Sequence, residues 1–260
     1  DSWTNLDFYR DLMLTSMADA KHRKLEKEVL SNADIVLSVG DTLSEELRVL
    51  GATDVRTVTN GFDREDFPTV NVEVDDKFTL AHIGAFSASR NHREFWSALK
   101  ELAEEDSSFR DDMVIRTVGQ VDYTVAASIK ETGLKSHWEK VDHVSHSEVL
   151  NYQLSSRVLL LMINDSPNAK GILPGKFFEY MASGRPILCI GPTDGDSAKV
   201  IEKTGAGIVV DHNDKEGLKS AILKLFKMGK EPLKSEDIEA YSRKKLTEKL
   251  SLILNELVGK

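Results

Sequence analysis

Short apolar runs alternate with amphipathic stretches along the chain from residue 78 onward. The runs recur about every 25 to 35 residues, which is typical of parallel strands joined by crossover helices. We expect strands at residues 78–83, 113–118, 139–144, 158–163, 186–190 and 207–210, and helices at 91–104, 122–132, 146–155, 175–183, 196–204 and 214–227. Several of the strands are apolar throughout, as strands covered on both faces are. The pattern predicts an α/β fold with a Rossmann-like parallel sheet and helices on both of its faces.

Further α/β elements precede this sheet. A long helical pattern comes first, and its apolar stripe consists of Leu14, Met17, Leu25 and Val29. A strand at 35–39, a helix at 41–50 and a strand at 55–58 follow. Residues 63–76 have neither a helical nor an alternating period and are interpreted as an interdomain linker. Because the pattern is under way at Asp1, we expect residues 1–62 to be the end of a truncated Rossmann-like domain and residues 77–235 to form a second domain.

The last helical pattern, at residues 238–258, is amphipathic. Its apolar positions are spaced by three and four residues and are Leu246, Leu250, Ile253 and Leu257. The opposite face is rich in both Lys and Glu, which favours a helix packed on protein over one lying on a membrane surface. Residues 236–260 are therefore expected to form a C-terminal helix that packs back on the preceding domain.

Charge, apolar run length and cysteine content argue against several classes of function. The 260 residues include 34 Lys and Arg and 43 Asp and Glu, a net charge of −9 that argues against a nucleic-acid partner. The longest apolar run, 158–163, is too short to span a membrane. The one cysteine, Cys189, lies in an apolar run and is expected to be a buried thiol rather than a nucleophile. We expect a cytoplasmic protein.

Metal and nucleotide motifs of the common kinds are absent from the sequence. His137, His143 and His146 lack the i,i+4 pairing and the nearby cysteines of a zinc site. Residues 194–197 lack the remainder of a calcium loop and are interpreted as a turn into a helix. The sequence contains no Gly-x-Gly-x-x-Gly after the first strand of the sheet and no Walker-type phosphate loop. We expect no metal and no bound cofactor.

Two loops follow predicted strands and could bind an anion. The loop 84–91 is rich in small residues and ends in Arg90, next to a helix start that would favour phosphate. Its structural alternative is a tight turn with a solvated arginine. In the second loop, Pro174 and Gly175 open a helix, with Lys176 in its first turn and Glu179 three residues later. The alternative there is an exposed i,i+3 ion pair.

Together these loops resemble the retaining glycosyltransferases of the GT-B type, group 1, which use nucleotide-sugar donors. The most specific match is residues 178–187, Phe-Glu-Tyr-Met-Ala-Ser-Gly-Arg-Pro-Ile, and the small-residue loop 84–90 agrees in order and spacing. Earlier phrases at 33–36, 43–47 and 59–63 are similar to the last stretch of the family's amino-terminal domain. The resemblance covers most of the chain. It implies that residues 77–235 form the nucleotide-sugar donor domain and that residues 1–62 end the acceptor-side domain.

The resemblance also implies roles for single residues. Arg90 and Lys176 would hold the donor diphosphate at the glycine loop, and Glu179 would accept hydrogen bonds from the ribose hydroxyls. The implied donor-binding set is Gly84, Arg90, Gly119, His143, Val144, Gly175, Lys176 and Glu179. His143 and Val144 would lie near the base, and Gly119 would keep the floor of the cleft open. No catalytic residue is assigned, since the acceptor chemistry would lie mostly on the missing half.

Two positions depart from the family pattern. Many members carry a glutamate eight residues before the one matched by Glu179, where this chain has Gly171. Many carry an arginine directly after the first glycine, where this chain has Ala85. These departures place the chain in a variant branch of the family, with Lys176 as the candidate to replace the arginine.

The implied activity is sugar transfer, with retention, from a nucleoside-diphosphate sugar to a glycan or lipid-linked acceptor in envelope polysaccharide synthesis. The isolated chain would be inactive because its acceptor half is incomplete. Membrane contact, at the inner face, would come only through the missing half. Two alternatives remain open, a non-catalytic nucleotide- or carbohydrate-binding module and a nucleotide-sugar epimerase of the same fold. Turnover of the nucleotide sugar, with or without an acceptor, would distinguish them.

Overall fold

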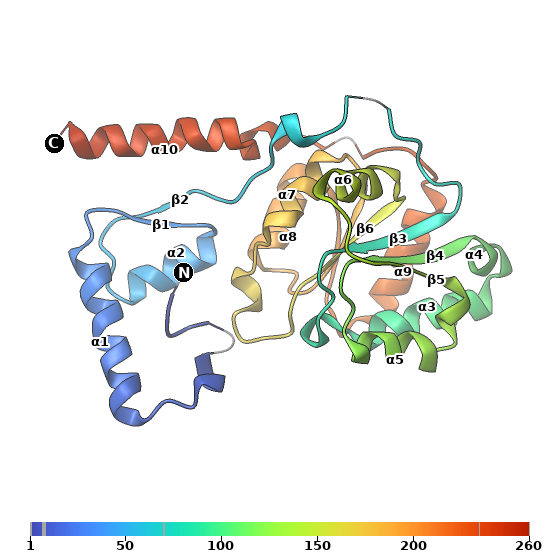
Figure 1. Cartoon of the computed structure of the whole chain (residues 1–260), viewed down its shortest axis with the longest axis horizontal. Coiled ribbons are helices and arrows are strands. Elements are labelled where there is room, and N and C mark those ends of the chain that lie inside the picture. Colours follow the sequence, from blue (N-terminus) through green and yellow to red (C-terminus); the bar gives the residue numbers. More distant parts are fainter. Residues whose placement is uncertain (1, 7–8, 70, 234, 260) are drawn as a thin grey trace.

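The computed structural model describes residues 2–6, 9–69, 71–233 and 235–259. A parallel sheet of six strands forms the larger part of the described fold (Figure 1). Its strands are β3 (Phe78–Ile83), β4 (Met113–Val118), β5 (Trp138–Val141), β6 (Val158–Met162), β7 (Ile187–Ile190) and β8 (Gly207–Val210). The helices around it are α3 (Arg93–Glu105), α4 (Ser107–Asp112), α5 (Tyr123–Glu131), α6 (His146–Ser155), α7 (Gly175–Ala182), α8 (Asp196–Thr204) and α9 (Lys215–Lys227). The predicted α/β class is confirmed.

The strand order places the site. The strands lie in the order β5-β4-β3-β6-β7-β8, with Ile83 of β3 opposite Val118 of β4 and Leu80 of β3 opposite Val158 of β6. The winding therefore reverses between the neighbouring strands β3 and β6. In sheets of this kind, ligands bind outside the carboxyl ends of the strands at that reversal.

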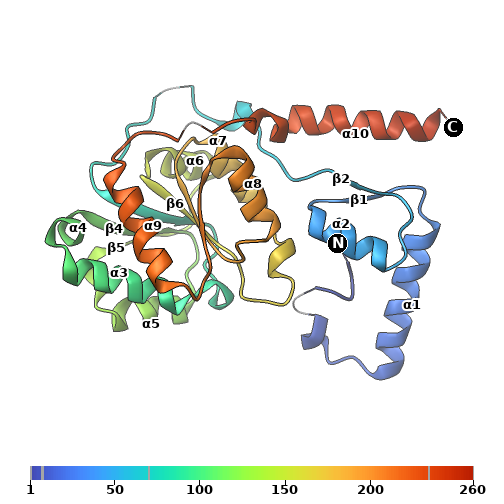
Figure 2. The ribbon, with the colours of Figure 1, turned by 180° about the vertical axis from the view of Figure 1, so that it is seen from behind.

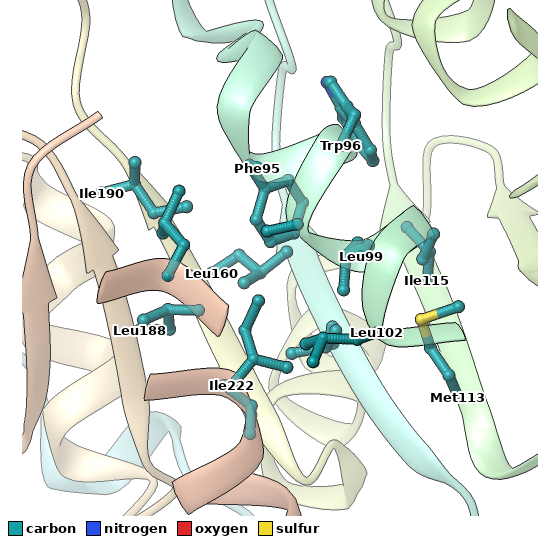
Figure 3. Packing of buried hydrophobic residues seen from close by; sticks show 14 of the residues in the cluster. Phe95, Trp96, Leu99, Leu102, Met113, Ile115, Leu160, Leu188, Ile190 and Ile222 are labelled. Carbon is teal, nitrogen blue, oxygen red and sulfur yellow. The ribbon is translucent and has the colours of Figure 1, made fainter. Parts of the chain in front are cut away.

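Alternate residues of the central strands enter two separate cores. Leu80 belongs to the cluster covered by α3 and α9, which contains Phe95, Leu99 and Ile222 (Figure 3). Its neighbour Ala81 belongs to the cluster on the other face, with residues of α7 and α8. Burying each large side chain contributes about 1.5 to 3 kcal/mol, so the two clusters fix the sheet from both sides. The predicted burial of Cys189 is confirmed, and it raises the pKa of the thiol to about 12.

One strand of this sheet ends earlier than predicted, and one helix beside it was not predicted. The strand expected at 139–144 is β5, which ends at Val141 because its partner β4 ends at Val118, opposite Val141. The helix α4 was not expected. It is six residues long, and Asp106 caps it by accepting hydrogen bonds from the backbone N–H groups of Ser108 and Phe109 at 2.8 and 3.1 Å. A segment this short carries no apolar period.

The elements before residue 63 form a smaller unit. They are α1 (Ser16–Asn32), β1 (Val36–Ser38), α2 (Asp41–Val49) and β2 (Val55–Thr57), and β1 and β2 pair in parallel. The helix expected here is α1, but its apolar stripe is not covered: Leu14 precedes the helix, and Met17, Leu25 and Val29 are exposed. The buried side chains of α1 are Glu26 and Leu30. The Glu26 carboxylate accepts hydrogen bonds from Ser2 and Thr4, which draws that face inward.

The chain returns to this smaller unit at its other end. Helix α10 (Arg243–Val258) follows a 3-10 turn at Ile238–Tyr241 and runs away from the six-stranded sheet, alongside β2 (Figures 1 and 2). Ile253 is its buried side chain, and Arg56 Nη2 lies 3.4 Å from Glu256 Oε2. The segment that follows β2 crosses the segment that precedes α10 at Phe62. There Phe62 N donates to Tyr241 O at 3.2 Å, and Arg243 N donates to Phe62 O at 2.8 Å. In the described residues, no helix has the length and apolarity needed to cross a membrane.

Candidate functional site

Two glycine turns meet at the carboxyl ends of β3 and β4. Gly84 has φ of +97° and Gly119 has φ of +108°, a region in which a side chain is strained. A Cβ on Gly119 would also lie 3.2 Å from the carbonyl oxygen of Gly84. The structure thus places these two predicted residues side by side at the edge where a ligand would bind.

Arg90 bridges the reversal of the sheet. It ends a 3-10 turn after β3, and its Nε donates to Oδ1 of Asn164, 2.8 Å away, in the loop that follows β6. Its Nη1 donates to the carbonyl of Ala85 at 3.0 Å. These contacts hold a half-buried guanidinium at the carboxyl ends of β3 and β6. The alternative of a freely solvated arginine does not describe its position.

Lys176 lies close to the same strand ends. Its Nζ donates to the carbonyl of Ile83 at 3.0 Å and lies 3.1 Å from Nε2 of His82. Burial, together with the nearby charge of Arg90, lowers the pKa of Lys176 to about 7. Among the described residues, no carboxylate forms an ion pair with Lys176. An anion placed beside this amine would favour its charged form.

The amino end of α7 is open. Its N-cap is Pro174, which has no side-chain hydrogen bond to the helix, and Gly175 is exposed with no atom within 4 Å of where a Cβ would stand. The first N–H groups of a helix lack partners within it, and the helix dipole makes that end positive. A phosphate can approach this helix end without meeting a side chain.

Glu179 does not pair with Lys176. One oxygen of its carboxylate, Oε2, accepts a hydrogen bond from Nε2 of Gln153 at 3.0 Å, while Lys176 is turned toward the end of β3. Gln153 belongs to α6 and is buried. The expected alternative of an exposed i,i+3 ion pair is therefore wrong, because burial of the ammonium at the sheet edge separates the two charges.

The remaining predicted residues border the edge from its outermost strand. His143 and Val144 follow β5, and His143 is exposed. Val144 packs against the cluster that contains Ile83 and Val118. Arg90 and Lys176 donate to the carbonyls of Ala85 and Ile83, the two neighbours of Gly84 in the chain, so the structure brings the three predicted residues together. It leaves His143 at the periphery.

Three polar residues at this edge were not anticipated. They are His82, Gln153 and Asn164. The His82 ring stacks on Phe86 with centroids 4.1 Å apart, and burial, with Lys176 and Arg90 nearby, holds its pKa well below the usual value, so the ring is neutral. Its buried Nδ1 has no hydrogen-bond partner. Asn164 was detectable as a polar residue directly after a buried strand, whereas nothing in the helical period marks Gln153.

A cavity of about 370 Å³ lies beside these groups. Arg90, Gly171 and Gly175 line one side, and Leu43 and Glu46 of α2 line the other. The smaller unit therefore supplies one wall. At Gly171, on the opposite side, a Cβ would stand 3.5 Å from Cγ2 of Thr42, an ordinary contact, so this position has room for a side chain and carries no carboxylate.

Comparison with known proteins identifies the family. The model for glycosyl transferases group 1 matches residues 63–245, and the chain belongs to this family. No curated protein sequence matches the chain significantly.

Solved structures share the fold at low sequence identity. Sucrose-phosphate synthase from Thermosynechococcus elongatus is 18% identical with a TM-score of 0.70, covering 98% of this chain and 66% of its own. HepE of Anabaena, solved with UDP and glucose, is 12% identical with a TM-score of 0.70, covering 91% and 67%. The pneumococcal O-GlcNAc transferase GtfA, solved with UDP and GlcNAc, is 14% identical with a TM-score of 0.66, covering 92% and 48%. The chain thus spans 66% of the synthase and about half of the pneumococcal enzyme.

Proposed function

We propose that this chain provides the nucleotide-sugar site of a glycosyltransferase that moves a sugar, with retention, from a nucleoside-diphosphate donor to a glycan or lipid-linked acceptor. The observation that carries the proposal is the convergence of Arg90, Lys176 and the open amino end of α7 at the reversal of the sheet. Two cations and a helix end are an anion site with more than one point of attachment.

The proposed diphosphate lies across the Gly84 loop and the amino end of α7. Arg90 offers a planar fork and Lys176 a point charge, and together they offset the charge that develops on a leaving nucleoside diphosphate. Because these cations supply the neutralising charge, we propose that binding needs no metal ion. Ala85 lacks the side chain that many family members place here, and Lys176 replaces its charge.

The proposed nucleoside lies toward β4 and β5. Glu179 accepts hydrogen bonds from the two ribose hydroxyls, as a carboxylate can. Gly119 leaves space beneath the nucleoside, and His143 and Val144 border the base. UDP is the first nucleotide to test, because HepE and the pneumococcal transferase were both solved with it.

One observation favours a second candidate, a binding module without turnover. Gly171 lines the cavity wall where many family members place a sugar-contacting glutamate. If no group replaces that carboxylate, the donor would bind and remain intact. Incubating the chain with UDP-sugars and analysing the products separates release of UDP from binding alone.

Calorimetry with UDP and uridine, each with and without EDTA, tests the proposal. UDP should bind far more tightly than uridine, the difference should shrink as ionic strength rises, and EDTA should leave it unchanged. Equal affinity for UDP and uridine would refute the diphosphate site. Loss of UDP binding on adding EDTA would refute the metal-free version.

A further inference from the structure

Four lysines from two helices line one cavity on the other side of Leu173 from the proposed donor site. Lys199 and Lys203 come from α8, and Lys245 and Lys249 come from α10. The cavity has a volume of about 360 Å³, which is at the small end of the range for small-molecule sites. Each pair is spaced by one helical turn, so both pairs project to the same side of their helix.

The two acidic residues of this cavity offset only part of the charge of its four lysines. Asp196 is buried, and its two oxygens accept hydrogen bonds from the backbone N–H of Thr42 at 3.0 Å and the hydroxyl of Thr42 at 2.7 Å. Asp41 accepts a hydrogen bond from the hydroxyl of Thr57 at 3.0 Å. Both carboxylates are engaged by the smaller unit, and four ammonium groups against two carboxylates leave the cavity with excess positive charge.

Two of the four lysines have an acidic partner. Lys199 Nζ lies 3.5 Å from Asp196, and Lys245 Nζ lies 2.7 Å from the exposed Glu248. Within the described residues, no ion pair is found for Lys203 or Lys249. Like charges one turn apart destabilise a helix slightly. The cluster of lysines is also unusual in a chain whose net charge is −9. An anion bound among the four lysines would reduce the repulsion between their ammonium groups.

We propose that this cavity binds a small soluble phosphate compound, of the size of pyrophosphate or a sugar phosphate, at a second site. Lysine binds phosphate as a compact point charge, and several lysines can share the charge of one dianion. Tyr241 and Leu246 add apolar surface beside the charges, which suits the carbon skeleton of a phosphate ester.

This second site is distinct from the donor site. Arg90 and Gly175 line the donor-side cavity, whereas the lysine cavity is lined by the ends of β1 and β2 together with α8 and α10. A phosphate bound there would contact both the larger and the smaller unit. The proposal does not depend on the donor assignment and can fail or hold independently of it.

Calorimetry on the full chain carrying Arg90→Ala tests the proposal, since that background weakens binding at the donor side. The probes are pyrophosphate, glucose 6-phosphate and vesicles of phosphatidylglycerol. Adding Lys203→Gln with Lys249→Gln should weaken pyrophosphate binding by about tenfold, as two exposed charge contacts are removed. The matched control, Lys224→Gln with Lys227→Gln on the exposed side of α9, removes the same charge and should change binding by less than about twofold.

Three outcomes would overturn the proposal. The first is the absence of saturable binding of either soluble phosphate to the Arg90→Ala chain. The second is an equal loss in the control variant, which would show a general effect of net charge. The third is binding to the vesicles alone, which would assign the lysines to a lipid surface. The lysines substituted in the test variant (Lys203 and Lys249) and in the control variant (Lys224 and Lys227) are all exposed. Thermal unfolding of each variant checks that the fold is unchanged.

Discussion

The side-chain amide of Gln153 donates a hydrogen bond to the carboxylate of Glu179, with 3.0 Å between Nε2 and Oε2. Gln153 is buried, so its rotamer is fixed by packing, and the Glu179 oxygen that it contacts is fixed with it. In the part of the chain that the structure describes, no side chain donates a hydrogen bond to the other carboxylate oxygen. Under the proposed function, a preoriented acceptor meets the ribose, and both residues can be tested separately.

Glu179→Gln should weaken UDP binding by about 1 to 3 kcal/mol, because the charge and one acceptor oxygen are lost while the shape is kept. The wild-type chain should prefer UDP over its 2′-deoxy analogue, and the variant should lose most of this preference. Calorimetric affinities for the two nucleotides measure it. An unchanged preference in the variant would remove Glu179 from the ribose site.

Gln153→Met keeps the approximate volume of the buried side chain and removes the donor to Glu179. We expect the preference for UDP over 2′-deoxy-UDP to fall severalfold, while the affinity for pyrophosphate stays the same, because the diphosphate contacts are elsewhere. The thermal midpoint should change little, since the variant also removes Oε1 of Gln153, which is buried without a partner. A parallel loss of both affinities would instead indicate general damage to the fold.

Arg90→Ala should weaken UDP binding by roughly tenfold to a hundredfold, the effect of one charged hydrogen-bonded contact. Arg93→Ala is the matched control: Arg93 is exposed at the start of α3, three residues further along. The salt dependence of UDP binding should also become less steep in Arg90→Ala and remain as it is in Arg93→Ala. Similar behaviour of the two variants would rule out a specific contact to the diphosphate.

The pKa of Lys176, lowered to about 7, gives a pH dependence. Above pH 7 a growing fraction of the free protein carries a neutral amine there, so the affinity for UDP should fall by up to roughly tenfold for each pH unit. The nucleotide's own last ionisation, near pH 6, is complete in this range. Measuring UDP affinity from pH 7 to 9 tests the expectation.

Lys176→Arg is the control for this effect, because a guanidinium stays charged throughout the range. Its UDP affinity should be nearly independent of pH. Stability gives a second check on the same group. The folded pKa lies below the unfolded value of about 10.4, so the unfolded chain binds more protons between pH 7 and 10. The Lys176 contribution to stability should therefore rise with pH across that window and be absent from Lys176→Met.

The sheet was predictable because buried parallel strands leave a strong signal. The runs 78–83, 113–118 and 207–210 match β3, β4 and β8 at both ends. The end of β5 was not predictable from its own residues, because Val118 of the neighbouring strand determines where pairing stops. The burial of Glu26 on α1 was not predictable from the helical period, because the hydroxyl groups of Ser2 and Thr4 that bind its carboxylate lie outside the helix.

Some parts of the site were likewise predictable from the sequence, and others were not. Gly84, Arg90 and Lys176 follow from strand ends and a helix start, which are local signals. The partners of Lys176 and Glu179 are not local: His82 is 94 residues away from Lys176, and Gln153 is 26 residues away from Glu179. Lys176 turns toward β3 and Glu179 toward α6, and these directions depend on how α7 packs against those two elements. The spacing of residues within α7 does not contain that information.

The crossing at Phe62 has a mechanical consequence. A single peptide segment between two bodies allows them to bend, to twist about the segment and to separate. Here two segments cross together and are joined by hydrogen bonds from Phe62 N to Tyr241 O and from Arg243 N to Phe62 O. Paired in this way, they resist twisting and stretching and leave bending as the soft motion. A movement of α2 away from Arg90 would also have to break the two hydrogen bonds that Thr42 of α2 donates to Asp196 of α8.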